Sequence, residues 1–155
     1  MNTETETIKQ QIQRHMINPI HLLRTDLIVV AETCTSISFN TLTKKLDIMN
    51  AMVNKEYFGK KFKVMPQENR IVMNYNNQYS PKQHTHSHLL VKIPKHLKWQ
   101  DVLDTMDKCW KHLDDRKKNK KFKIYVRETS GKVDNVIYAT RQLKDNYKDN
   151  EFGWL

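Results

Sequence analysis

The sequence predicts an α+β protein with a single central, mostly antiparallel sheet and helices packed on it. Three observations lead to this fold class. Short apolar runs of strand length alternate with amphipathic helical segments, and two of the strand segments are separated only by a short polar turn, which is the α+β pattern. No linker rich in Pro, Gly or Ser divides the chain, and its 155 residues suit one domain. We therefore expect a single domain over residues 1–155.

The N-terminal part is predicted to contain a helix, a strand and a second helix. Apolar residues recur at helical spacing over residues 7–17, inside an N-terminal helical extension of residues 1–20, and Pro19 ends this helix. Residues 27–31 are a continuous apolar run, as expected for a central strand that is covered on both sides. Apolar residues at helical spacing form a second stripe, which indicates a helix over residues 40–56.

The rest of the chain is predicted to contain three strands and two helices. These elements are a strand over residues 70–76, a turn at 76–78, a strand over 84–93, a helix over 99–114, a strand over 122–127 and a helix over 135–147. Most strand segments are rich in β-branched and aromatic residues. The chain holds no apolar run long enough for a membrane span, so we expect no membrane partner.

The charge of the chain indicates a polyanionic partner. Twenty-seven Lys and Arg against seventeen Asp and Glu give a net charge of +10, and such a balance attracts nucleic acid. Two clusters supply the candidate DNA contacts: Lys60, Lys61, Lys63, Arg116, Lys117, Lys118, Lys120 and Lys121. The aromatic residues Tyr57, Phe58, Phe62, Phe122 and Tyr125 interleave with them and could stack on bases. A solvated lysine surface explains the charge equally well.

The strand over residues 84–93 carries the most informative pattern. His84, His86 and His88 alternate with other residues, so we expect the three imidazoles together on the open face of the sheet. The intervening positions Leu89 and Val91 should pack against the helices. Two imidazoles at i and i+2 can reach one cation, and imidazole suits first-row metals. The alternative is an exposed histidine cluster that holds no ligand or only an adventitious zinc ion.

The last predicted helix places Tyr138 and Gln142 one turn apart on an exposed side. The amide oxygen of Gln142 could bind a metal, and the phenol of Tyr138 could attack a phosphate bound to the same metal. The phenol would need activation by the metal, by a nearby base or by Arg141. A tyrosine that only covers a surface is the alternative.

At these residues the sequence resembles the HUH endonuclease superfamily. The segment from His86 to Val91, followed by a helix, a strand and a helix that bears Tyr138, is similar to the motifs of that family. The resemblance implies an HUH-like fold in which His86 and His88 bind Mg²⁺ or Mn²⁺. It also implies that Tyr138 forms a 5′-phosphotyrosine link with single-stranded DNA, so the chain would be a DNA nicking and joining enzyme.

Two branches of the superfamily fit. A further histidine, here His84, often precedes the pair in rolling-circle replication initiators, and the long stretch before the histidine strand favours this branch. In single-tyrosine insertion-sequence transposases, which are dimers, a glutamine at the place of Gln142 completes the metal site. Ser87 stands where the family prefers a bulky apolar residue, and Arg141 stands where many initiators have a lysine. Glu32 and Glu68 are further candidates for the third ligand, ranked below Gln142.

These motifs imply a setting and partners. The acidic, polar N-terminus does not suit a secretory signal, so we expect an intracellular, cytoplasmic protein encoded by a plasmid, phage or other mobile element. The expected partners are single-stranded DNA, which could form a hairpin, and a separate helicase or host replication proteins. The protein could be a monomer or a homodimer. A non-catalytic basic nucleic-acid-binding protein and a metal-dependent hydrolase without a covalent step are the competing hypotheses.

Overall fold

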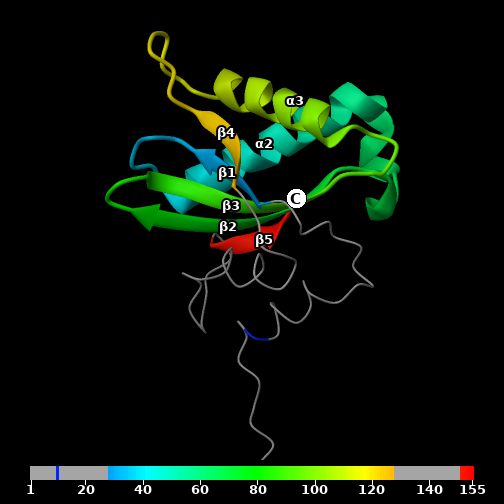
Figure 1. Cartoon of the computed structure of the whole chain (residues 1–155), viewed down its shortest axis with the longest axis horizontal. Coiled ribbons are helices and arrows are strands. Elements are labelled where there is room, and N and C mark those ends of the chain that lie inside the picture. Colours follow the sequence, from blue (N-terminus) through cyan, green and yellow to red (C-terminus); the bar gives the residue numbers. More distant parts are fainter. Residues whose placement is uncertain (1–9, 11–27, 128–150) are drawn as a thin grey trace, which may run out of the picture.

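A five-stranded antiparallel sheet in the order β4-β1-β3-β2-β5 organises the protein. The computed structural model describes residue 10 and residues 28–127 and 151–155. Its elements are β1 (Ile28–Glu32), α2 (Phe39–Phe58), the short 3₁₀ helices η2 (Gly59–Val64) and η3 (Gln67–Asn69), β2 (Val72–Ser80), β3 (His84–Lys92), α3 (Trp99–His112), β4 (Lys123–Arg127) and β5 (Phe152–Trp154). Helices α2 and α3 lie on the same side of the sheet, and the α+β class is confirmed (Figure 1).

Helix α2 begins and ends at residues suited to those positions. Ser38 is the N-cap: its backbone is extended and its hydroxyl accepts a 3.1 Å hydrogen bond from the backbone N–H of Thr41. The helix ends at Gly59, whose φ of 70° is costly for any residue with a Cβ. Between these ends, one stripe faces the sheet, and its buried apolar residues are Leu42, Leu46, Met49 and Val53.

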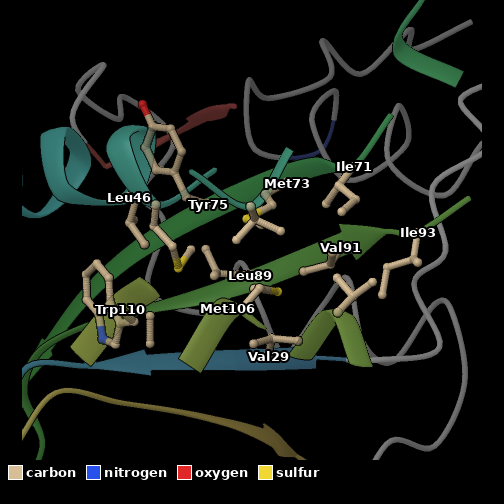
Figure 2. Close-up of a cluster of buried hydrophobic side chains, with 14 of the residues drawn as sticks. Val29, Leu46, Ile71, Met73, Tyr75, Leu89, Val91, Ile93, Met106 and Trp110 are labelled. Atoms are coloured by element: carbon tan, nitrogen blue, oxygen red, sulfur yellow. The ribbon is translucent and has the colours of Figure 1, made fainter. Parts of the chain in front are cut away.

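The hydrophobic core fills the space between the sheet and the two helices (Figure 2). The residues from β3 are Leu89 and Val91, so the prediction that this side of the strand packs on the helices is confirmed. Trp110 of α3 stacks on Phe122 with ring centroids 4.9 Å apart. Its indole N–H also donates a 3.0 Å hydrogen bond to the backbone oxygen of Glu32, which ties α3 to the end of β1.

A buried amide joins α2 to the start of β2. The side chain of Asn54 accepts a 2.9 Å hydrogen bond from the backbone N–H of Ile71 and donates one of 2.9 Å to the carbonyl of the same residue. Asn54 is fully buried, so these bonds satisfy backbone groups that water does not reach. The C-terminal end of α2 is therefore placed beside the start of β2.

The structure corrects two expectations about the strands. Residues 76–78 are not a turn: β2 continues to Ser80, and the turn lies at residues 81–83. Their polar side chains were read as a turn signal, but they form ladder pairs with β3. Strand β5, which pairs with β2, was not predicted because three residues are too few to show a pattern. The predicted helices over 7–17 and 135–147 lie outside the described residues, except for residue 10.

No helix in the described residues is long and apolar enough to cross a membrane.

Candidate functional site

The strand register brings polar side chains from four strands to the side of the sheet that bears His86 and His88. Residues directly opposite each other in antiparallel strands point to the same side. One row across β4, β1, β3 and β2 is Lys123, Glu32, His86 and Gln78. The next row is Tyr125, Val30, His88 and Asn76. We call these two rows, which lie opposite the helices, the histidine side of the sheet.

The two imidazoles lie next to each other on β3, with ring centroids 5.2 Å apart and ring planes at 53°. The Nδ1 atom of His86 is 2.9 Å from the carbonyl oxygen of His84. A carbonyl oxygen can only accept, so Nδ1 carries the hydrogen, and in the neutral ring the lone pair is on Nε2. A backbone carbonyl that fixes the tautomer in this way is a common feature around histidines that bind metals.

The structure corrects the expected exposure of the histidine cluster. His86 and His88 are both 0% exposed, so the prediction that they lie on an open face is wrong. His84 does not complete a triplet: its φ is 58°, and its ring bonds to the hydroxyl of Ser36, 3.3 Å away in the loop after β1. Strand alternation requires an extended backbone, and His84 departs from it at the start of β3.

Glu32 lies opposite His86 in the register, and a network of side chains holds its carboxylate. Oε1 accepts hydrogen bonds from the hydroxyl of Tyr125 at 2.7 Å and from the amide of Gln83 at 3.0 Å. Oε2 is 3.3 Å from the ammonium of Lys123. Glu32 was a predicted accessory residue, whereas the roles of Tyr125, Gln83 and Lys123 were missed. The alternation of Lys123 and Tyr125 on β4 was a signal that could have placed both beside Glu32.

This network sets the charge of both of its acidic groups. Burial raises the pKa of Glu32, but the hydrogen bonds from Tyr125, Gln83 and Lys123 outweigh it and hold that pKa below its ordinary value. Burial and then the hydrogen bond to Glu32 raise the pKa of Tyr125 to about 12. At neutral pH the site therefore presents a carboxylate held by a neutral phenol.

Alternate amides of the polar run on β2 belong to the same side of the sheet, whereas Asn77 points to the helices and bonds to Thr43. The amide of Asn76 donates hydrogen bonds to the carbonyl of His88 at 3.1 Å and to the side-chain oxygen of Asn74 at 2.8 Å. Asn76 and Gln78 are buried. The sequence showed a run of amides directly before a histidine strand, which could have indicated a polar site shared by two strands.

The described residues supply only some of the ligands that a cation would need. Within residues 28–127 and 151–155, no three His, Cys, Asp or Glu side chains gather closely enough to hold a metal ion together. The imidazoles of His86 and His88 fit as two neutral ligands, so a complete site needs at least one further donor. Gln142, with Tyr138 and Arg141, lies outside the described residues, and these predicted roles stay predictions.

Glu68, the other acidic candidate, lies in η3 and lines a cavity of about 610 Å³ with Tyr57, Phe58, Lys61 and His96, among others. The ring of Phe58 meets that of His96 edge-on at 6.3 Å. The residues that line this cavity do not include any from the two rows of the histidine side. Glu68 is therefore not brought together with His86 and His88.

The two basic clusters lie at opposite ends of the sheet. Lys60, Lys61 and Lys63 are exposed on η2, after the end of α2 that Asn54 ties to the start of β2. The cluster over residues 116–121 follows α3 and contacts the end of β1 (Figure 1).

Several residues of these clusters have structural roles. The guanidinium of Arg116 donates to Asp114 at 2.8 and 2.9 Å and to the carbonyl of Thr33 at 3.0 Å. Phe62 and Phe122 are buried, so the expectation that they stack on bases is wrong. Both side chains lie in the apolar interior. A sequence in which basic and aromatic residues alternate does not show whether the aromatic rings are buried in this way or lie on a surface that stacks on bases. The other predicted lysine contacts stay predictions.

No family model, curated protein or solved structure matches this chain.

Proposed function

We propose that the protein is a metal-dependent endonuclease and strand transferase for single-stranded DNA, with an HUH-like fold and a 5′-phosphotyrosine intermediate. The observation that carries the proposal is the pair of adjacent imidazoles on the central part of an antiparallel sheet, 5.2 Å apart, with the tautomer of His86 fixed by a backbone carbonyl. An antiparallel sheet with helices on one side and a polar, histidine-bearing other side supports it further.

In this proposal His86 and His88 would hold the cation through ring nitrogens, and Gln142 would supply an amide oxygen. Bound Mg²⁺ or Mn²⁺ would withdraw charge from a non-bridging oxygen of the scissile phosphate. Glu32, held in its charged form, lies opposite His86 in the register. Its carboxylate is already paired with the ammonium of Lys123, 3.3 Å away, so the imidazoles and Gln142, and not Glu32, would hold the cation.

The nucleophile is the phenol oxygen of Tyr138. It forms a bond to the phosphorus while the bond from phosphorus to the 3′ oxygen breaks, so the DNA leaves a free 3′-hydroxyl and the protein keeps the 5′ phosphate. The proton of the phenol is lost and the 3′ oxygen gains one. The reverse attack by a 3′-hydroxyl rejoins a strand and needs no external energy source. Burial and the hydrogen bond to Glu32 raise the pKa of Tyr125 to about 12, so its phenolate forms less readily than that of an ordinary tyrosine, whose pKa is about 10.

Two biological settings use this chemistry. We favour a rolling-circle replication initiator that works with a separate helicase, because the chain before β3 is long and includes α2 and the two 3₁₀ helices η2 and η3. A single-tyrosine transposase is the alternative within the same superfamily.

The proposal is tested by incubating the protein with a mixed pool of single-stranded oligonucleotides and Mn²⁺, followed by denaturing electrophoresis. The wild type should give a band of protein linked to DNA. Tyr138→Phe should abolish this band while DNA binding survives. Tyr79→Phe, at an exposed tyrosine on β2, is the matched control and should leave the band unchanged.

Other outcomes identify the competing functions. Salt-sensitive DNA binding without cleavage under either metal would indicate a non-catalytic nucleic-acid-binding protein. Cleavage that is lost in His86→Ala but retained in Tyr138→Phe would indicate a metal-dependent hydrolase without a covalent step.

A further inference from the structure

We propose that the α3–β4 loop (residues 113–122) binds the backbone phosphates of the DNA strand at the histidine site, and that Asp114 is the positioning residue that holds this loop in shape. The inference rests on the proposed function for the identity of the strand. It separates two basic clusters that the sequence could not rank, and it assigns the lysines of η2 no part in holding that strand.

The first support is the place of the loop. Its Arg116 donates a hydrogen bond to the carbonyl of Thr33, the residue that follows Glu32, and the Lys121 carbonyl is 3.5 Å from the sulfur of Cys34. Glu32 in turn is the partner of His86 in the β1–β3 ladder. The loop therefore adjoins the end of the sheet at which His86 lies.

The second support is the way in which the loop is held. Asp114 is only 4% exposed. Its carboxylate accepts hydrogen bonds from the Nε and Nη2 atoms of Arg116 and from the backbone N–H groups of Arg116, Lys121 and Phe122, at 2.8 to 3.1 Å. One buried carboxylate thus joins the start of the loop to its end. A loop ordered before binding loses less conformational entropy when a ligand binds.

The third support is what the held loop presents to solvent. Lys117, Lys118, Lys120 and Lys121 are exposed, whereas the charge of Arg116 is engaged by Asp114. The exposed carboxylate of Asp115 pairs with Lys45 of α2 at 3.2 Å. The loop therefore displays four exposed ammonium groups within five consecutive residues, 117–121, and these can contact the phosphates of a strand.

The position of the η2 lysines explains why we expect them, unlike the lysines of the α3–β4 loop, to contribute little to binding at the histidine site. The η2 cluster follows the end of α2 and lies near the start of β2; its lysines are Lys60, Lys61 and Lys63. The start of β2 pairs with the C-terminal end of β3, which is the end remote from His86. From His86 to Lys92 the strand covers about 20 Å. This exceeds the Debye length of about 8 Å at physiological salt, so these lysines contribute little to binding at the histidine site.

The test compares two triple variants that lose the same charge. One carries Lys117→Gln, Lys118→Gln and Lys120→Gln, and the other carries Lys60→Gln, Lys61→Gln and Lys63→Gln. Binding of labelled oligo(dT) is measured by fluorescence anisotropy over a series of salt concentrations in EDTA, so that no cleavage is involved. We expect the loop variant to bind about tenfold more weakly and its salt slope to fall by about 2, since each single-strand phosphate contact contributes about 0.7.

The η2 variant should keep the affinity and slope of the wild type within about twofold. Equal losses in the two variants, no loss in the loop variant, or no binding of oligo(dT) by the wild type would each overturn the proposal. Because the assay uses no metal and leaves Tyr138 intact, it separates this inference from the nuclease proposal. DNA binding through the loop can hold while no covalent adduct forms, and an adduct can form while the loop variant binds normally.

The role of Asp114 is tested in the same assay. Asp114→Asn keeps the lysines, and we expect it to weaken oligo(dT) binding severalfold while circular dichroism shows a folded protein. Combined with the loop triple variant it should cause a smaller loss than it does alone, because Lys121 is then the only one of the four exposed loop lysines left for Asp114 to position. Additive losses, or an unchanged affinity in Asp114→Asn, would contradict the positioning role.

Discussion

The hydroxyl of Tyr125 donates a 2.7 Å hydrogen bond to the carboxylate of Glu32, which lies opposite His86 in the strand register. This bond connects the edge strand β4 to the middle of the histidine side. Burial together with this bond raises the pKa of Tyr125 to about 12, and the bond acts with those from Gln83 and Lys123 to hold the pKa of Glu32 below its ordinary value against the effect of burial.

Tyr125→Phe should remove this bond and destabilise the protein by about 1 kcal/mol, the usual net value of one hydrogen bond. The measurement is urea unfolding at neutral pH. Tyr79→Phe is the control, because Tyr79 is half exposed, and it should change the free energy of unfolding by less than about 0.5 kcal/mol. Equal effects in the two variants would show that the bond to Glu32 contributes nothing.

The His86 ring should carry its hydrogen on Nδ1. Nitrogen-15 shifts of the imidazoles should show Nδ1 of His86 as protonated and Nε2 as bare, in keeping with the 2.9 Å contact to the His84 carbonyl. Titration with Mn²⁺ should broaden the signals of His86 and His88 before those of His112, which is exposed at the end of α3. Simultaneous broadening of all three would argue against a site at the pair.

Asp114 should make stability depend on pH in the acid range. Hydrogen bonds from Arg116, and then from backbone N–H groups, outweigh burial and hold the pKa of Asp114 far below the unfolded value of about 3.9. The contribution to the free energy of unfolding is therefore complete at neutral pH and is lost as the pH falls below about 4.

Asp114→Asn should remove that part of the pH dependence and cost about 3 kcal/mol at neutral pH, because it leaves Arg116 without its carboxylate. Urea unfolding at neutral and acid pH checks both effects. An equal loss of stability at the two pH values would contradict the assignment. Asp115→Asn, at a carboxylate with a side chain 93% exposed, is the control and should have little effect.

Asn54→Ala should destabilise the protein by about 2 to 4 kcal/mol, because the N–H and C=O groups of Ile71 would be left buried without their partner. Thermal or urea unfolding measures this loss. Asn40→Ala, the same change at an exposed site of α2, should alter stability by less than about 0.5 kcal/mol. A loss of similar size at both positions would show that the bonds to Ile71 contribute nothing specific, because the change to Ala improves helix propensity at either site.

The fold was predicted well where one side of an element is apolar. The stripe of α2 and the alternation of Leu89 and Val91 in β3 reported burial directly, because only the apolar side can face the helices. β2 was cut short because its amides, Asn76 to Gln78, resemble a turn when they are read without their partners on β3. Asn76 and Gln78 lie opposite His88 and His86, whereas Asn77 points to the helices and bonds to Thr43 of α2, and these neighbours exist only in the folded sheet.

The candidate site was predicted in part. Alternation along β3 places His86 and His88 together, but it says nothing about what covers them, and both are buried. Glu32 and Tyr125 are 93 residues apart in the sequence, so their hydrogen bond depends on which strands become neighbours. Strand order is decided by the whole sheet, and no short segment carries it.

The ladder of β3 has a consequence for changes in chain length. If this strand shifted by one position against β1 and β2, the imidazoles of His86 and His88 would point into the hydrophobic core that contains Met106 and Trp110. Leu89 and Val91 would then point to the other side of the sheet. Insertions or deletions in the hairpin are therefore tolerable only where the connection at 81–83 absorbs them. A shift of a single residue would therefore disrupt the histidine pair and the hydrophobic core together.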